Sequence, residues 1–195
     1  QDQIPTEEYL PDQRIKVLVS KVDNTTKGPQ IFVSRTHPDL LKRLFEQEVP
    51  EIYEEIIEIR NIAREAGSRS KVAVYSNDEN LDVKGACIGR NGMRIQNIID
   101  ELCGEKIDIV LWNEDITEFV KNALNPAEVL SVEIIEEGEE NMKVARVLVA
   151  ENQLSLAIGK KGQNSRLAAR LCGVKIDIHT EPSEVEENRE FEEKS

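Results

Sequence analysis

Two glycine loops carry the residues of this chain that are best suited to hold a phosphate group. Residues 89–92 read Gly-Arg-Asn-Gly, residues 159–162 read Gly-Lys-Lys-Gly, and an isoleucine precedes each loop. Glycine lacks the β-carbon that would keep a sugar-phosphate chain at a distance, and the middle positions hold three bases and one amide. A helix that begins directly after such a loop adds unpaired N–H groups and a positive dipole end, which attract anions.

The loops belong to a longer internal repeat. Residues 86–109 read ACIGRNGMRIQNIIDELCGEKIDI, and residues 157–178 read AIGKKGQNSRLAARLCGVKIDI. Both copies run Ile-Gly-x-x-Gly, then a helical stretch ending in Leu-Cys-Gly, then Lys-Ile-Asp-Ile. A single Gly-x-x-Gly is more often only a sharp turn between helices, but its return at the same place in two repeats favours a binding role.

The elements that position the loops follow one order in both copies. Apolar residues at helical spacing predict a helix after each loop, and alternation predicts a strand after each helix. Gly104 and Gly173 stand where a helix-ending glycine is expected. Upstream, the patterns predict a helix at residues 38–45 with strands at 56–62 and 72–75, and a helix at 116–124 with strands at 129–135 and 144–149. Each copy therefore predicts an α+β unit, with a three-stranded sheet and helices on one face.

The loop sequences resemble a known family. Residues 88–95, Ile-Gly-Arg-Asn-Gly-Met-Arg-Ile, are similar to the I-G-x-x-G-x-x-I signature of KH domains, and the element order resembles the type II arrangement. The second copy has Ser165 where an aliphatic residue is usual, and Leu167 stands close enough to take over its packing. In this family the loop clamps the backbone of about four nucleotides. The resemblance implies RNA-binding roles for Gly89, Arg90, Asn91, Gly92, Arg94, Gly159, Lys160, Lys161, Gly162, Gln163, Asn164 and Arg166.

Most of the chain also resembles the central region of a family of bacterial transcription elongation and termination factors. The similarity rests on stretches such as Ser-Arg-Thr-His-Pro at 34–38 and Gln-Leu-Ser-Leu-Ala-Ile-Gly at 153–159. The resemblance implies four regions: the C-terminal part of an S1-like OB domain at 1–36, KH domains at 37–112 and 113–180, and an acidic, disordered tail at 181–195. The earlier barrel strands and the N-terminal domain of that family would precede residue 1, where the chain lacks an initiator methionine.

The same resemblance implies a function and its partners. It implies binding of single-stranded nascent RNA during elongation, pausing, termination and antitermination. RNA polymerase and other elongation factors would be the protein partners, and the protein would be cytoplasmic. The S1-like segment is assigned no RNA site, because two strands cannot make a stable barrel and the earlier strands would supply much of an OB nucleic-acid face.

The net charge of −13 is unusual for an RNA-binding protein, but it is unevenly distributed. Residues 133–140 hold five glutamates and no base, and residues 181–195 hold seven glutamates against two bases, so each run carries −5. We expect a solvated turn at the first run and a disordered tail at the second. The rest of the chain is near balance, so a local basic loop can still attract RNA.

Catalysis, metals and membranes find little support in the composition. The three cysteines have no C-x-x-C spacing, which predicts reduced core residues, and the two histidines are far apart, so we expect no metal and no cofactor. No apolar run is long enough to span a membrane. Aromatic residues make up only 4% of the chain, which leaves few rings for stacking on bases.

Three alternatives remain. The first is a fragment of another KH-containing RNA-processing or ribosomal protein. The second is a nucleotide-binding enzyme, although neither loop has the Walker A or the G-x-G-x-x-G spacing. The third is an acidic scaffold that binds only proteins, which would leave the basic loops unexplained.

Overall fold

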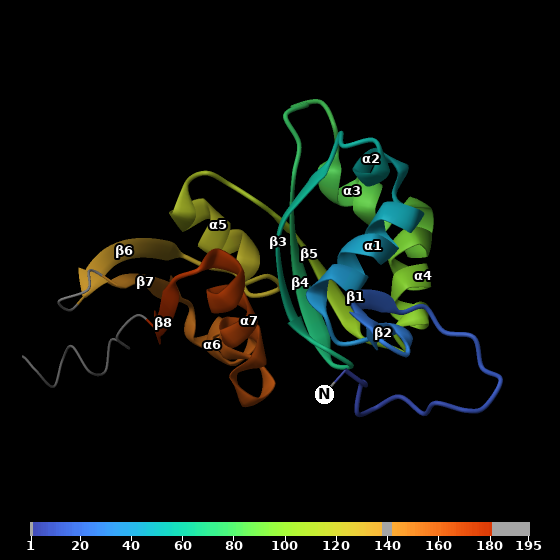
Figure 1. The fold of residues 1–195 in the computed structure, drawn as a ribbon. Coiled ribbons are helices and arrows are strands. Elements are labelled where there is room, and N and C mark those ends of the chain that lie inside the picture. The colour runs from blue at the N-terminus through green and yellow to red at the C-terminus, as the bar shows by residue number, and fades with distance from the viewer. Residues whose placement is uncertain (1, 138–141, 181–195) are drawn as a thin grey trace, which may run out of the picture. The chain divides into compact units, whose positions relative to one another are not determined.

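The structure is a computed structural model that describes residues 2–137 and 142–180 (Figure 1). The chain divides into two compact units, Gln1–Asn113 and Glu114–Ser195. Both units contain a three-stranded sheet and helices, so the predicted α+β class is confirmed. The predicted acidic tail at 181–195 lies outside the described residues.

The first unit contains a β-hairpin and the first repeat. The hairpin is β1 (Leu18–Thr25) and β2 (Gly28–Ser34). The repeat comprises α1 (Pro38–Glu48), α2 (Pro50–Tyr53), β3 (Glu58–Glu65), β4 (Arg69–Tyr75), α3 (Val83–Ile88), the 3₁₀ turn η1 (Arg90–Gly92), α4 (Met93–Glu101) and β5 (Lys106–Leu111). The sheet order is β3-β4-β5, and β4 runs antiparallel to β3 and parallel to β5. Helices α1, α3 and α4 lie together on one side of this sheet (Figure 1).

The second unit repeats the same topology. Its elements are α5 (Ile116–Ala123), β6 (Ser131–Glu137), β7 (Met142–Val149), α6 (Glu151–Ile158), the 3₁₀ turn η2 (Lys160–Gly162), α7 (Gln163–Cys172) and β8 (Lys175–Thr180). The sheet order is β6-β7-β8, again with the central strand antiparallel to the first and parallel to the last. Parallel strands need a crossover. In each unit the helix–loop–helix segment is that crossover, so the sheet fixes where the glycine loop lies.

Capping residues explain where several helices begin. The His37 ring accepts a hydrogen bond from the Asp39 N–H, and Pro38 follows it at the first helical position of α1. The Asp82 side chain caps α3 in the same way, and that of Asp115 caps α5. The buried faces of α1 and α4 then pack on β4 and β5 around Phe45, Val72, Ile98 and Ile109.

The end of α4 corrects one sequence prediction. Cys103 takes the left-handed position directly after this helix, with φ 54°, and Gly104 follows it with φ 97°. The Cys103 N–H bonds to the Asp100 carbonyl and the Gly104 N–H to the Ile99 carbonyl, which is the Schellman pattern. After α7, Gly173 itself holds the left-handed position, with φ 69°. The left-handed residue therefore stands eleven positions after the second glycine of the loop in both copies, and the extra residue of the first copy follows it in the turn.

The acidic run and the cysteines also differ from expectation. Residues 133–137 extend β6 instead of forming a turn, and residues 138–140 lie outside the described part of the chain. Cys87 is buried and Cys172 half-buried, but Cys103 is exposed in its turn, so the prediction of three core cysteines is wrong for that residue. Burial raises the pKa of the Cys87 thiol to about 12. None of the helices described is long and apolar enough to cross a membrane.

Arg35 connects the hairpin segment to the first repeat. Arg35 is only 3% exposed, and its guanidinium donates to both oxygens of the Glu7 carboxylate. It also donates to the Lys16 carbonyl at 2.7 Å and to the Glu101 carboxylate at 3.1 Å. A buried arginine with this many acceptors holds the N-terminal segment, the end of β2 and the end of α4 in one arrangement.

A second buried ion pair lies inside the first unit. Arg64 and Glu105 form two hydrogen bonds of 2.9 Å, and both side chains are at most 1% exposed. Glu105 also accepts from the Ser70 hydroxyl at 2.7 Å and from the Gly67 N–H at 2.9 Å. All four acceptor directions of the carboxylate are thus used, which is what a buried charge requires.

Candidate nucleic-acid interface

The two glycine loops have nearly the same backbone shape. The first glycine has φ 78° and ψ 170° at Gly89, and φ 77° and ψ 170° at Gly159. The third residue is left-handed in both, with φ 54° at Asn91 and φ 53° at Lys161. In each loop the second glycine donates its N–H to the carbonyl of the first at 3.0 Å. Loops with different middle residues therefore fold into one geometry.

The first glycine of each loop is required by space as well as by angle. A β-carbon on Gly89 would lie 2.6 Å from Cγ of Arg94, and one on Gly159 would lie 2.8 Å from the backbone nitrogen of Asn164. Both neighbours stand five residues after the glycine, in the first turn of the following helix. The first glycine of each loop therefore allows the helix before the loop and the helix after it to approach closely.

The second glycine faces open space. A β-carbon on Gly92 would meet no described atom within 4 Å, and one on Gly162 would meet only the end of the Arg166 side chain at 3.9 Å. Both residues are left-handed, with φ 74° and φ 72°, and each is the N-cap of the next helix. Among the described residues no side chain caps α4 or α7. The first turns of these helices thus present N–H groups beside an uncovered backbone, as anion binding requires.

The middle residues of both loops are exposed. Arg90 and Asn91 lie at the tip of the first loop, and Lys160 and Lys161 at the tip of the second. The tips can therefore present three positive charges and one amide to a ligand.

Arg94 and Asn164 connect helices to one another. The Arg94 guanidinium donates to the Ala86 carbonyl at 2.7 Å and to the Glu51 carboxylate at 2.9 Å. The Asn164 amide nitrogen donates to the carbonyls of Leu124 at 2.9 Å and Ala157 at 3.0 Å. Each residue thus ties the helix after the loop to the helix before it and to a third helix.

This arrangement corrects the predicted contact set. Asn164 is 0% exposed, so its side chain cannot reach an RNA strand. Arg94 is about one-third exposed, with its side chain at 32%, and is already held by two acceptors. We therefore assign Asn164 a structural role and place Arg94 at the margin of the surface.

The remaining predicted residues lie in the first turn of α7 or close to it. Gln163 is half-buried, and Arg166 is exposed with its guanidinium donating to the Lys161 carbonyl at 3.0 Å. The Ser165 hydroxyl donates to the Gly162 carbonyl at 3.2 Å, while Leu167 is fully buried. Leu167 thus does pack in the core, as expected from the departure at Ser165.

Exposed apolar side chains beside the loops were missed by the sequence reasoning. Met93 is 63% exposed directly after the first loop, and Leu156 and Ile158 are 44% and 38% exposed directly before the second. Ile158, which precedes the second loop, therefore does not anchor it in the core, and Ala157 is the buried residue there. The exposure of apolar residues at the end of a helix could have been predicted from the sequence only if the buried face of that helix had been known.

Comparison with known proteins agrees with this architecture. Residues 35–112 match the model of the NusA-like first KH domain, and residues 116–186 match that of the NusA-like second KH domain. A crystal structure of the protein APE1850 superposes with a TM-score of 0.53 at 23% identity, covering 71% of this chain and 95% of that one. At this identity the likeness establishes the fold alone.

Curated relatives are much more similar in sequence. Transcription termination/antitermination protein NusA of Bacillus subtilis is 56% identical over 198 residues, which is 97% of this chain and 52% of the relative. The proteins of the same name from Halalkalibacterium halodurans and Thermus thermophilus are each 55% identical, over 95% and 94% of this chain and 47% and 46% of their own lengths. This chain therefore spans about half the length of these relatives, and its two KH domains with the preceding hairpin place it in the NusA family.

Proposed function

We propose that this chain binds single-stranded RNA through both glycine loops, as the RNA-binding part of a transcription elongation, pausing, termination and antitermination factor. Nascent RNA would be the ligand, and RNA polymerase with other elongation factors would be the protein partners. The main support is the shared loop geometry: two exposed tips with basic or amide residues, each at the start of an uncapped helix.

The loops and the apolar residues beside them suit the two chemistries of a single strand. The phosphates would lie over Gly92 and Gly162, where no β-carbon intervenes and the helix N–H groups converge. The bases, which are not held in a duplex, would pack against Met93 near the first loop and against Leu156 and Ile158 near the second.

Two variants test the loops directly. Arg90→Asp with Asn91→Asp places two acids on the first tip, and Lys160→Asp with Lys161→Asp does the same on the second. All four side chains are exposed, so the fold should tolerate the changes, with a stability change of about 0.5 kcal/mol or less. Each variant should bind a single-stranded RNA oligonucleotide much more weakly than the parent in a filter-binding assay, at an unchanged melting temperature.

A matched control carries the same change of four charges elsewhere. Lys143→Asp with Lys175→Asp alters two exposed lysines on β7 and β8, away from the second loop in sequence. This control should bind RNA far better than the Lys160/Lys161 variant. A loop variant that binds as well as the parent would exclude its loop from the RNA surface.

Salt dependence measures how far phosphate contacts carry the binding. For single strands the logarithm of affinity falls by about 0.7 per phosphate contact for each tenfold rise in salt. With about three to six contacts in two loops, the slope should be roughly −2 to −4. An RNA affinity that does not change with salt would contradict the proposal. The difference in RNA affinity between the two loop variants should become smaller at high salt, because salt screens their charges.

A further inference from the structure

A groove lies between α1 and the edge strand β3, in the first unit and on different elements from the glycine loop. It consists of two adjoining cavities of about 390 Å³ and 270 Å³, which share Lys42 and Ile59. We call it the β3 groove. Its floor is apolar, with Ile52 and Ile57 buried and Ile59 and Ile62 half-buried. We propose that the β3 groove binds a short, extended protein segment that combines basic and apolar residues.

The lining shows that the backbone edge of β3 is part of the groove. Residues 57–59 line one cavity, and residues 59–62 line the other. Successive residues of a regular strand point to opposite faces of the sheet, but the pairing of β3 with β4 is irregular between Ile59 and Asn61. Consecutive residues therefore line the cavities where this bulged strand edge faces them. β3 pairs with β4 on one side, and no described strand pairs with its other side. An extended segment could therefore lie alongside this edge, as in strand addition.

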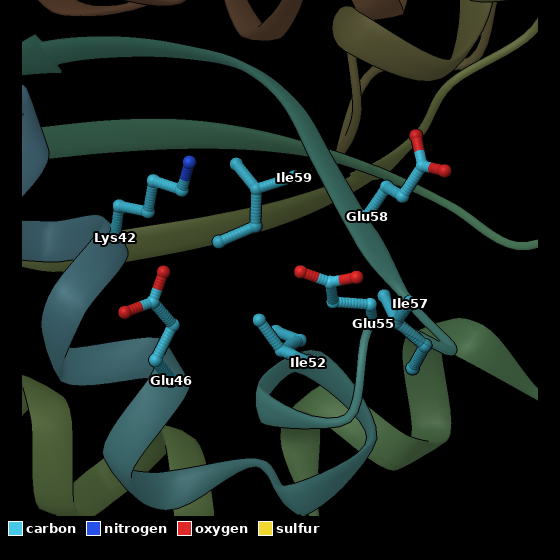
Figure 2. Close-up of a pocket in the computed structure, with 7 residues that line it drawn as sticks. All are labelled: Lys42, Glu46, Ile52, Glu55, Ile57, Glu58 and Ile59. Atoms are coloured by element: carbon cyan, nitrogen blue, oxygen red, sulfur yellow. The ribbon is translucent and has the colours of Figure 1, made fainter.

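The charge of the β3 groove selects the occupant. Four carboxylates line it, from Asp39, Glu46, Glu55 and Glu58, against the two bases Lys42 and Arg60. Glu46 is paired with Arg43 at 2.7 Å and Glu58 with Arg60 at 3.0 Å, so the excess of negative charge comes from Asp39 and Glu55 against Lys42. Figure 2 shows the Glu55 carboxylate directed into the space between α1 and β3, above the apolar side chain of Ile52, while the Glu46 carboxylate lies beside α1. An excess of fixed negative charge repels a phosphate backbone, so this surface disfavours RNA and favours a basic segment. Its four isoleucines then require apolar residues among the basic ones.

Glu55 supports this reading through its backbone. It has φ 61°, in the left-handed region that a residue with a side chain seldom occupies. It follows α2, where Ile56 and Ile57 both donate to the Glu51 carbonyl at 2.9 Å, and glycine is the usual residue in such a turn. A glutamate there places a carboxylate over the groove at a cost in backbone strain, and such strain is found where function requires it.

The experiment uses a fluorescein-labelled synthetic peptide of alternating valine and lysine, about six residues long, the length of an average strand. Its counterpart alternates valine and glutamate. Binding to the whole chain is measured by fluorescence anisotropy, and the bound surface is mapped from backbone amide shifts. The basic peptide should bind at least about tenfold more tightly than the acidic one. The shifts should concentrate at residues 57–62 and leave both glycine loops unchanged.

Variants of the groove give the sharper test. Glu55→Gly keeps the turn and relieves its strain, so it should raise the melting temperature while weakening the basic peptide about threefold, the effect of one exposed charge. Glu55→Lys with Glu58→Lys should weaken it about tenfold or more. The matched control Glu54→Lys reverses a neighbouring exposed charge outside the groove and should bind like the parent.

Three results would overturn the proposal. The first is equal binding of the acidic and basic peptides, and the second is an equal loss in the Glu54→Lys control. The third is displacement of the peptide by a single-stranded RNA oligonucleotide, which would make the groove a nucleic-acid surface. Variants of the β3 groove should keep the RNA affinity of the parent, so failure here is distinguishable from failure of the loops.

Discussion

The two KH domains fill the same corner of their sheets with different chemistry, ionic in the first domain and apolar in the second. In the first, Arg64 of β3 is the sheet partner of Ser70 of β4, and both bond to Glu105 before β5. In the second, the register puts Ile134 opposite Ala145, and the repeat puts Val174 where the first copy has Glu105. A buried ionic cluster in one domain thus corresponds to three apolar residues in the other.

The loops show the reverse relation. Their middle residues differ, but their backbone angles agree within a few degrees. The loop geometry is therefore kept while the chemistry of a distant core corner changes. A corner can be filled in more than one way because only volume and satisfied polar groups matter there, whereas the proposed RNA contact uses the loop backbone itself.

The largest effect on stability should come from replacing only one of the three residues at this corner. Glu105→Val alone leaves Arg64 buried without its partner, and breaking such a pair costs about 3–5 kcal/mol. The first unit should lose that much stability in urea denaturation, followed by the fluorescence of Trp112, the only tryptophan of the chain.

Full conversion is the matched control. Arg64→Ile, Ser70→Ala and Glu105→Val together reproduce the residues of the second domain. This triple variant should regain most of the lost stability, because replacing a whole buried ion pair by apolar residues is often neutral or better. If the triple variant is as unstable as the single one, the two corners are not interchangeable.

The next effect concerns the two glycines of one loop. Gly159→Ala should cost about 1–3 kcal/mol from backbone strain, and more from the overlap with the Asn164 backbone. Gly162→Ala meets open space and should cost only the left-handed penalty of about 1–2 kcal/mol. Hydrogen exchange of the α7 amides measures both. Equal losses would show that the close approach of Asn164 has no energetic weight.

A smaller effect should separate the two helix-tying residues. Asn164→Ala leaves two buried carbonyls without their donor, so we expect a loss of about 2 kcal/mol in the second unit. Arg94→Ala removes a partly exposed side chain and should cost about 1 kcal/mol in the first. Calorimetric melting of each variant provides the comparison, and a larger loss for Arg94→Ala would reverse it.

The smallest effect is a dependence of the stability of the first unit on acidic pH. Burial alone would raise the pKa of Glu7, but hydrogen bonds from Arg35 and Tyr9 and the charge of Arg35 outweigh it, so the pKa lies below its usual 4.5. A carboxyl group that binds protons less tightly when folded stabilises the fold above pH 4.5, and this contribution is lost as the pH falls through the lowered pKa.

Urea midpoints measured by Trp112 fluorescence should therefore fall from about pH 5 towards about pH 3, an interval that spans the usual pKa of 4.5. Glu7→Gln should be less stable at neutral pH and should lose less on acidification. The same acid slope in both proteins would assign the effect to other carboxylates.

The sequence predicted most of the fold but few of the buried polar contacts that stabilise it. The repeat gave the element order and both loops, because hydrophobic periodicity and paired glycines are local signals. The Arg64–Glu105 pair joins residues 41 positions apart, and nothing local indicates that two charges are buried together. Polarity alone cannot distinguish an exposed amide from a buried one, so the predicted RNA contact of Asn164 is wrong.

The Cys103 turn shows a different limit. Aligning the copies on Leu-Cys-Gly places Gly104 opposite Gly173. The left-handed residue, however, stands at the same distance from the loop in both copies, so Cys103 holds that position in the first copy. Alignment of identical residues identified the repeat correctly but placed the left-handed residue after α4 one position too late.

Lys161 has a consequence for attempts to stabilise this protein. It holds the same left-handed conformation as Asn91, although asparagine tolerates that region far better than lysine. Lys161→Asn would thus make the second loop resemble the first and relax its backbone, while removing one of its two charges. Selection for heat resistance alone would favour that exchange and select against affinity for RNA, so the two properties would have to be screened together at this position.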